Sequence, residues 1–147
     1  MQTSPEGLEF ITKHEGEVLS VYNDVAGYPT IGVGHLIRDD DPDFSGGITH
    51  AQAIDLLRED AGHAEDSVSN RVTVALTQTQ YDALVSFVFN IGGGAFRAST
   101  LLRLLNQGRY DDVPEQLRRW NKAGGKVVQG LINRREAECR LWKDGIY

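Results

Sequence analysis

The sequence predicts an α+β fold, in which a small antiparallel sheet near the N-terminus is accompanied by a larger group of helices. β-forming residues are concentrated between residues 18 and 37, where closely spaced glycine and proline residues mark tight turns. From residue 49 onward, apolar residues recur at helical spacing behind two capping signals. A first helix is predicted before the sheet, over about residues 5–15.

The first helix has both of its ends marked in the sequence. Ser4 is suited to cap it, and Pro5 fits the first helical position, where no backbone N–H is needed. Gly16 then ends it. The apolar side of this helix is formed by Leu8, Phe10 and Ile11.

The sheet is predicted from a change of composition after Gly16. Its β-formers are Val18, Val21, Tyr22, Val25, Tyr28, Ile31 and Val33, punctuated by Gly27, Pro29, Gly32 and Gly34. A loop follows from Arg38 to Gly47, and its aspartates make it strongly acidic.

Two capping boxes begin the main helices. Thr49 with Gln52, and Thr77 with Gln80, have the spacing at which each side chain bonds the other residue's backbone N–H. A glycine run at 92–94 stops the second of these helices. Three shorter helices are then predicted at about 100–107, 112–121 and 131–143.

The length of 147 residues suits one compact domain. We expect a single domain over 1–147, with a sheet lobe at about 16–48 and a helical lobe at about 49–147 plus the N-terminal helix. A cleft between two such lobes is a common place for an extended ligand. No apolar run approaches the roughly 18 residues that a membrane helix needs. The N-terminus lacks a basic and apolar leader pattern, so no signal peptide is expected.

Charge is unevenly distributed along the chain. Residues 1–96 contain four Lys/Arg and fifteen Asp/Glu, a net −11, whereas residues 97–147 contain eleven and six, a net +5. One interpretation is that the charges belong to solvated helix faces. The other is that the basic C-terminal half is attracted to an anionic polymer, such as a cell wall or nucleic acid. The charge distribution alone does not distinguish these two interpretations. The single cysteine, Cys139, cannot form an internal disulfide and is expected to be a small buried apolar residue.

Three residues near the N-terminus carry the functional groups that a glycoside hydrolase uses, although by composition and spacing alone they are three ordinary polar residues near a small sheet. Such an enzyme needs a carboxylic acid to protonate the leaving oxygen and a second group that holds a water or stabilises the transition state. Glu15 closes a mostly apolar helix, a setting that suits a protonated acid. Asp24 lies in a polar turn that favours its ionised form, and Thr30, across that turn, offers a hydroxyl for a water.

The context of these residues resembles the signature of the phage T4-type lysozymes, also called endolysin muramidases, and is closest to their shorter, lambdoid-phage-like members. Glu15, Asp24 and Thr30 are separated by eight and five intervening residues, as in that family. The resemblance covers nearly the whole chain. It is carried by His14-Glu15-Gly16, Tyr22-Asn23-Asp24, Pro29-Thr30-Ile31-Gly32-Val33-Gly34-His35, Phe89-Asn90-Ile91-Gly92, Ser99-Thr100-Leu101-Leu102, Trp120-Asn121 and Asn133-Arg134-Arg135.

The resemblance implies a lysozyme-like fold and a role for each matched residue. Glu15 matches the general acid, while Asp24 and Thr30 match the pair that positions the attacking water or shields the cation. The resemblance favours inversion at the anomeric carbon over retention and leaves the stereochemistry open. His35 matches a structural histidine, and Arg134 an arginine that pairs with the catalytic glutamate. The residues that match the substrate-binding lining of the family are Gly34, Leu36, Phe89, Asn90 and Ser99.

The predicted function is therefore that of a phage endolysin, a muramidase that cleaves the β-1,4 bond between N-acetylmuramic acid and N-acetylglucosamine. A lytic transglycosylase and a secreted antibacterial effector with the same fold remain as alternatives. We expect a monomer whose partner is bacterial peptidoglycan, with no cofactor, no metal, no nucleic acid and no integral membrane segment. It would be made in the host cytoplasm and act in the periplasm after release.

The acidic loop and the histidines do not form a recognisable metal motif. Asp39, Asp41 and Asp43 resemble the start of a calcium-binding EF-hand loop, but Phe44 and His50 stand where that loop needs glycine and glutamate. The four histidines of the chain lack the short spacings of a zinc site, which argues against a zinc amidase.

Overall fold

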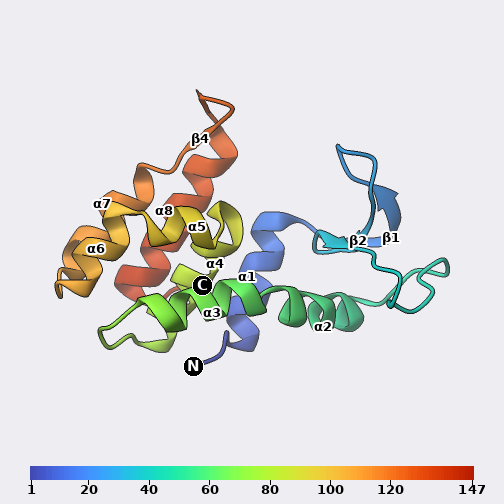
Figure 1. Cartoon of the computed structure of the whole chain (residues 1–147), viewed down its shortest axis with the longest axis horizontal. Helices are drawn as coiled ribbons and strands as arrows, with labels where there is room; N and C mark the ends of the chain where they lie inside the picture. The colour runs from blue at the N-terminus through green and yellow to red at the C-terminus, as the bar shows by residue number, and fades with distance from the viewer. The chain divides into compact units, whose positions relative to one another are not determined.

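The computed structural model describes all residues of the chain, 1–147 (Figure 1). The chain forms two compact units, one made of Leu8–Gly62 and the other of Met1–Gly7 with His63–Tyr147. The helices and strands are α1 (Pro5–Glu15), β1 (Val18–Asn23), β2 (Pro29–Gly32), β3 (His35–Leu36), α2 (His50–Asp60), α3 (Gly62–Arg71), α4 (Gln78–Ile91), α5 (Gly93–Arg97), α6 (Thr100–Asn106), η1 (Tyr110–Asp112), α7 (Val113–Arg118), β4 (Lys122–Ala123), β5 (Lys126–Val127) and α8 (Gln129–Asp144). The α+β prediction is confirmed. None of the helices combines the length and apolarity needed to cross a bilayer.

The start of α1 is fixed by side-chain contacts, as the sequence predicted. The Ser4 hydroxyl accepts the backbone N–H of Gly7 at 2.9 Å, the position of a helix N-cap. Gly7 is required there, since a Cβ on it would lie 2.6 Å from the carboxyl carbon of Asp82. Further along α1, Leu8 and Ile11 are completely buried, as expected for its apolar side.

The sheet of the Leu8–Gly62 unit has the strand order β1-β2-β3, with both pairs antiparallel. In this register Thr30 of β2 lies between Tyr22 of β1 and Leu36 of β3. β2 also packs on α2, where a Cβ placed on Gly32 would lie 3.6 Å from the Cβ of Ala53. The sheet is therefore anchored to α2 through its central strand. Its edge strand β1 stays exposed along its whole length.

Helix α4 is the core of the second unit. All eight residues from Tyr81 to Val88 are buried, so α4 is covered on every side. It packs against α8, which also packs against α7 (Figure 1). The predicted capping boxes of Thr77 with Gln80 and of Thr49 with Gln52 are both present, at the starts of α4 and α2.

The fully buried carboxylate of Asp82 joins both chain ends to α4. Its Oδ1 accepts the Ser4 backbone N–H at 3.1 Å and the side-chain amide of Gln78 at 2.9 Å. Its Oδ2 accepts the hydroxyls of Ser4 and of Tyr147. Burial, together with this bond to Asp82, raises the pKa of Tyr147 to about 12. The expected burial of Cys139 is also observed, and it raises the pKa of that thiol to about 11.

The C-terminal part differs from the sequence-based expectation. The helix predicted at about 112–121 ends at Arg118, and the hairpin of β4 and β5 follows it. This hairpin turns at Gly124 and Gly125, whose φ angles of 58° and 79° are those that a two-residue turn requires. The short helices α3 and α5 were also not predicted.

We expect Asp82→Ala to destabilise the fold by about 2–4 kcal/mol, because it leaves several part-buried donors without their acceptor. The free energy of unfolding from urea denaturation measures this. Asp66→Ala, on an exposed position of α3, is the matched control and should change stability by less than about 0.5 kcal/mol. Equal stability of the two variants would contradict the assigned role of Asp82.

Candidate functional site

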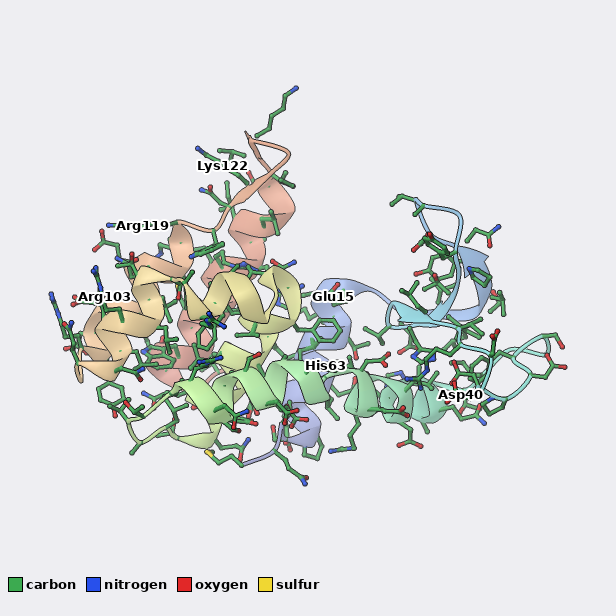
Figure 2. All side chains as sticks on the ribbon, in the orientation of Figure 1. Glu15, Asp40, His63, Arg103, Arg119 and Lys122 are labelled. Carbon is green, nitrogen blue, oxygen red and sulfur yellow. The ribbon has the colours of Figure 1, made fainter.

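The three proposed catalytic residues all lie in the Leu8–Gly62 unit. Glu15 is the last residue of α1, at the point where the chain leaves the helix (Figure 2). The next residue, Gly16, closes the helix by donating its N–H to the Thr12 carbonyl at 2.8 Å. The side chain of Glu15 is exposed, although the sequence suggested an apolar setting.

Asp24 holds together the turn between β1 and β2. Its Oδ1 accepts the backbone N–H groups of Ala26 and Tyr28, both at 2.9 Å. Its own backbone N–H donates to the Tyr28 carbonyl, also at 2.9 Å. These donors provide the polar setting that the sequence predicted. The other carboxylate oxygen, Oδ2, takes no part in the turn.

Thr30 lies at the other side of the same turn, in β2. It is 2% exposed, and its hydroxyl donates to the Tyr28 carbonyl at 2.9 Å. Because that bond uses the hydroxyl proton, the Thr30 oxygen is left to act as an acceptor. Asp24 and Thr30 are therefore both bonded to the backbone of Tyr28, and the structure brings these two residues together.

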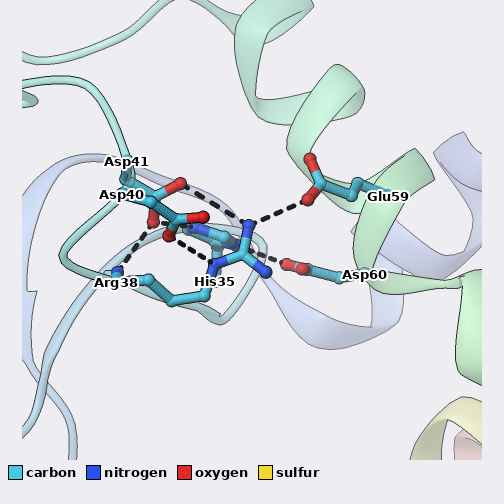
Figure 3. Close-up of polar contacts among 6 residues, drawn as sticks. All are labelled: His35, Arg38, Asp40, Asp41, Glu59 and Asp60. Atoms are coloured by element: carbon cyan, nitrogen blue, oxygen red, sulfur yellow. Dashed lines mark hydrogen bonds and ion pairs between the residues drawn. The ribbon is translucent and has the colours of Figure 1, made fainter.

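His35 links the acidic loop to α2 (Figure 3). Its Nδ1 lies 2.7 Å from the carboxylate of Asp60, and its Nε2 lies 2.8 Å from that of Asp41. Arg38 reinforces this link, since its backbone N–H donates to Asp41 at 2.8 Å and its guanidinium donates to Glu59 at 2.8 Å. Through these contacts His35 holds the acidic loop to α2, while its match to the structural histidine of the family stays a prediction. The contacts also give the acidic loop a role in the fold.

Protonation of His35 is coupled to this arrangement. Burial of the imidazole opposes its protonation, but the hydrogen bonds and charges of Asp41 and Asp60 outweigh burial and raise the pKa of His35 above its ordinary value. Burial raises the pKa of Asp41, but the hydrogen bonds from the Arg38 backbone N–H and from His35 outweigh burial and lower that pKa overall.

The predicted substrate-binding residues lie in both units. Gly34 and Leu36 are exposed beside β2, where Leu36 pairs directly with Thr30. Phe89 is half-buried and Asn90 is exposed, both near the end of α4. Ser99 is buried as the N-cap of α6, where its hydroxyl donates to the Phe96 carbonyl and accepts the Leu102 N–H. Its side chain is therefore occupied by the helix cap.

Arg134 belongs to a buried charged network of the helical unit. Its Nη2 donates to the Ser86 carbonyl at 2.9 Å, and its Nε lies 3.3 Å from the carboxylate of Glu138. The same carboxylate accepts the Ser86 hydroxyl at 2.7 Å and lies 2.8 Å from Nε of Arg135. Burial raises the pKa of Glu138, while the two guanidinium groups oppose that rise. The pairing of Arg134 with Glu15 stays a prediction.

Sequence reasoning missed Glu138 and Arg135 as members of this network. The signal was present, because Glu138 follows Arg135 and Arg134 by three and four residues, the spacing at which side chains meet on a helix. No group of three or more histidine, cysteine or acidic side chains in the structure is arranged to hold a metal ion.

Comparison with known proteins gives consistent similarities. The family model described as Phage lysozyme matches residues 12–138. The endolysin of Bacillus phage PZA is 46% identical over 99% of this chain, and the chain spans 56% of that relative's length. A crystal structure of a variant of P22 lysozyme superposes with a TM-score of 0.89 at 42% identity, covering 97% of this chain and 98% of that one. The muramidase domain of SpmX from Asticaccaulis excentricus has a TM-score of 0.85 and 35% identity, with 97% of each chain covered.

The raised pKa of His35 predicts a pH dependence of stability. The folded protein holds the histidine proton more tightly than the unfolded chain does, so this contribution is complete below about pH 6.5, where a free histidine titrates. It is lost as the pH rises through the raised pKa. Melting temperatures between pH 5 and pH 8.5 should therefore decline more steeply for the wild type than for His35→Gln. Parallel declines would contradict the stabilising contacts of protonated His35 with Asp41 and Asp60.

Proposed function

Because the chain belongs to the phage lysozyme family, whose model matches residues 12–138, we propose that it is a peptidoglycan hydrolase. The resemblance that the sequence motifs indicated is thereby confirmed at the level of the family, and so is the lysozyme-like fold. The proposed reaction is that of a muramidase, hydrolysis of the β-1,4 bond between N-acetylmuramic acid and N-acetylglucosamine. Family membership over most of the chain is the observation that carries this proposal.

In the proposed mechanism, Glu15 protonates the glycosidic oxygen as the bond to the leaving sugar breaks. Its position at an exposed helix end supports this role, because the carboxyl has to reach an oxygen of a long polymer. The helix fixes the backbone of Glu15, and the glycine that follows leaves room beside its carboxyl.

Asp24 and Thr30 would position the attacking water. Asp24 Oδ2 and Thr30 Oγ1 are both left as acceptors by the bonds that close the turn. A water that donates one hydrogen to each of them keeps its lone pairs for the anomeric carbon. The ionised Asp24 would also stabilise positive charge that develops on the sugar. A lytic transglycosylase needs no such pair, so these two residues favour hydrolysis.

We further propose that residues 1–147 act as one catalytic domain and as a monomer, with peptidoglycan and no nucleic acid as the partner. The proposed setting is that of a phage endolysin, made in the host cytoplasm and active in the periplasm after release. An antibacterial effector delivered by secretion would perform the same chemistry. Lysis of an expressing host only when a phage membrane-lesion protein is coexpressed would support the endolysin setting.

Glu15→Gln should reduce the release of reducing ends from purified peptidoglycan by at least about a hundredfold, because glutamine keeps the volume but cannot donate the proton. Its melting temperature should match that of the wild type. Glu6→Gln makes the same change in the exposed first turn of α1 and should keep full activity. Activity of Glu15→Gln above a few per cent would contradict the assignment.

Asp24→Asn separates the charge of this residue from its structural bonds. The amide oxygen still accepts from Ala26 and Tyr28, so stability should be retained, while activity falls because the second acceptor becomes a donor. Asp24→Ala should lose both activity and stability, because it removes the acceptor that closes the turn. Full activity of Asp24→Asn would exclude the carboxylate from the mechanism.

The wild-type digest distinguishes the hydrolase from the transglycosylase. Hydrolysis in H₂¹⁸O should place one heavy oxygen on each new reducing muramic acid end, since water is the acceptor. Mass spectrometry of the products measures this. Unlabelled anhydro-muramic ends would show the transglycosylase reaction instead.

A further inference from the structure

Arg135 is buried, but it reaches the exposed end of α4. Only 1% of Arg135 is accessible to solvent, and its Nη2 donates to the side-chain oxygen of Asn90. Asn90 is the second-last residue of α4 and is itself exposed. A buried cation therefore makes a direct bond to a residue at the surface of the unit.

The guanidinium of Arg135 is held in place from several sides. Its Nε lies 2.8 Å from the buried carboxylate of Glu138, and its Nη1 donates to the Trp120 carbonyl at 3.4 Å. Its central carbon lies 5.0 Å from the centre of the Phe87 ring, a cation–π contact. These contacts come from three separate parts of the chain, so the group that meets Asn90 has a fixed position.

This bond determines which way the Asn90 amide faces. A guanidinium has only donors, so the atom of Asn90 that meets it has to be the carbonyl oxygen. The NH₂ group then points away from Arg135, and no protein acceptor bonds to it. The positive charge on the oxygen side also polarises the amide and makes its N–H groups better donors.

We propose that Arg135 is a positioning residue that presents the NH₂ group of Asn90 to an amide carbonyl oxygen of the substrate. This inference rests on the proposed function, in which the substrate is peptidoglycan, a polymer that carries an N-acetyl carbonyl on every sugar. A fixed donor recognises such an oxygen with little loss of side-chain entropy, because its orientation is set before binding. Arg135 itself does not touch the substrate.

The first test changes the donor and leaves its partner in place. Asn90→Asp keeps the oxygen that Arg135 bonds, but it replaces NH₂ by an oxygen that repels a carbonyl. We expect KM for soluble peptidoglycan fragments to rise about tenfold, with kcat changed less than about twofold. Asn70→Asp, the same change at an exposed position of α3, should leave both constants unchanged. An unchanged KM, or a loss confined to kcat, would overturn the proposal.

The second test asks whether Arg135 acts through Asn90. Arg135→Lys keeps a positive charge beside Glu138 but lacks the fork that also reaches Asn90. We expect Arg135→Lys and Asn90→Ala each to raise KM about three- to tenfold, and the double variant to resemble Asn90→Ala alone. Effects on KM that multiply in the double variant would overturn the positioning role. If Arg135→Lys does not fold, the Asn90→Asp result decides the proposal.

Failure of this inference is distinguishable from failure of the proposed function. A wild-type protein that releases no reducing ends from peptidoglycan would refute the hydrolase and with it this role of Asn90. A wild-type protein that cleaves, is inactivated by Glu15→Gln and is insensitive to Asn90→Asp would refute the Asn90 role alone.

Discussion

The buried carboxylate of Glu138 sets the arrangement of the residues around it. Taking a carboxylate out of water costs several kcal/mol unless opposite charges and hydrogen-bond donors replace the solvent. Here two guanidinium groups, those of Arg134 and Arg135, come from the preceding turn of the same helix, and the Ser86 hydroxyl comes from α4. Once both cations are held by Glu138, their remaining N–H groups have fixed directions. One guanidinium then meets the Ser86 carbonyl and the other meets Asn90.

Features encoded within a few residues could be predicted from the sequence. The capping boxes at Thr49 and Thr77 and the cap at Ser4 are local signals, because each partner lies three residues away. The sheet at residues 18–37 was predicted for the same reason, since β-formers and turn residues alternate over a short stretch. The hairpin of β4 and β5 carried an equally local signal in Gly124 and Gly125. Its strands are two residues long, too short to interrupt the helical pattern around them.

Contacts between distant residues could not be predicted in this way. Asp82 meets Ser4 and Tyr147, residues 78 and 65 positions away, and nothing in the local sequence marks such partners. The two hydrogen bonds of His35, to Asp41 and to Asp60, were equally unpredictable, because Asp41 belongs to a loop whose sequence indicated only an acidic character. For the site, the motifs identified which residues to consider through their resemblance to a family. They contained no information on the direction of each hydrogen bond.

That direction is what distinguishes the proposed site residues from one another. Asp24 uses one oxygen to close its turn and keeps the other, and Thr30 uses its proton and keeps an acceptor oxygen. Asn90 uses its oxygen on Arg135 and keeps a donor. Ser99 differs, because its hydroxyl both donates and accepts within the cap of α6. A side chain that uses one polar atom for a hydrogen bond within the protein is held in a fixed orientation. Its second polar atom can then form a hydrogen bond with a ligand. By this criterion Asn90 is a better candidate than Ser99 for contact with substrate, although both residues match the substrate-binding lining of the family in the sequence motifs.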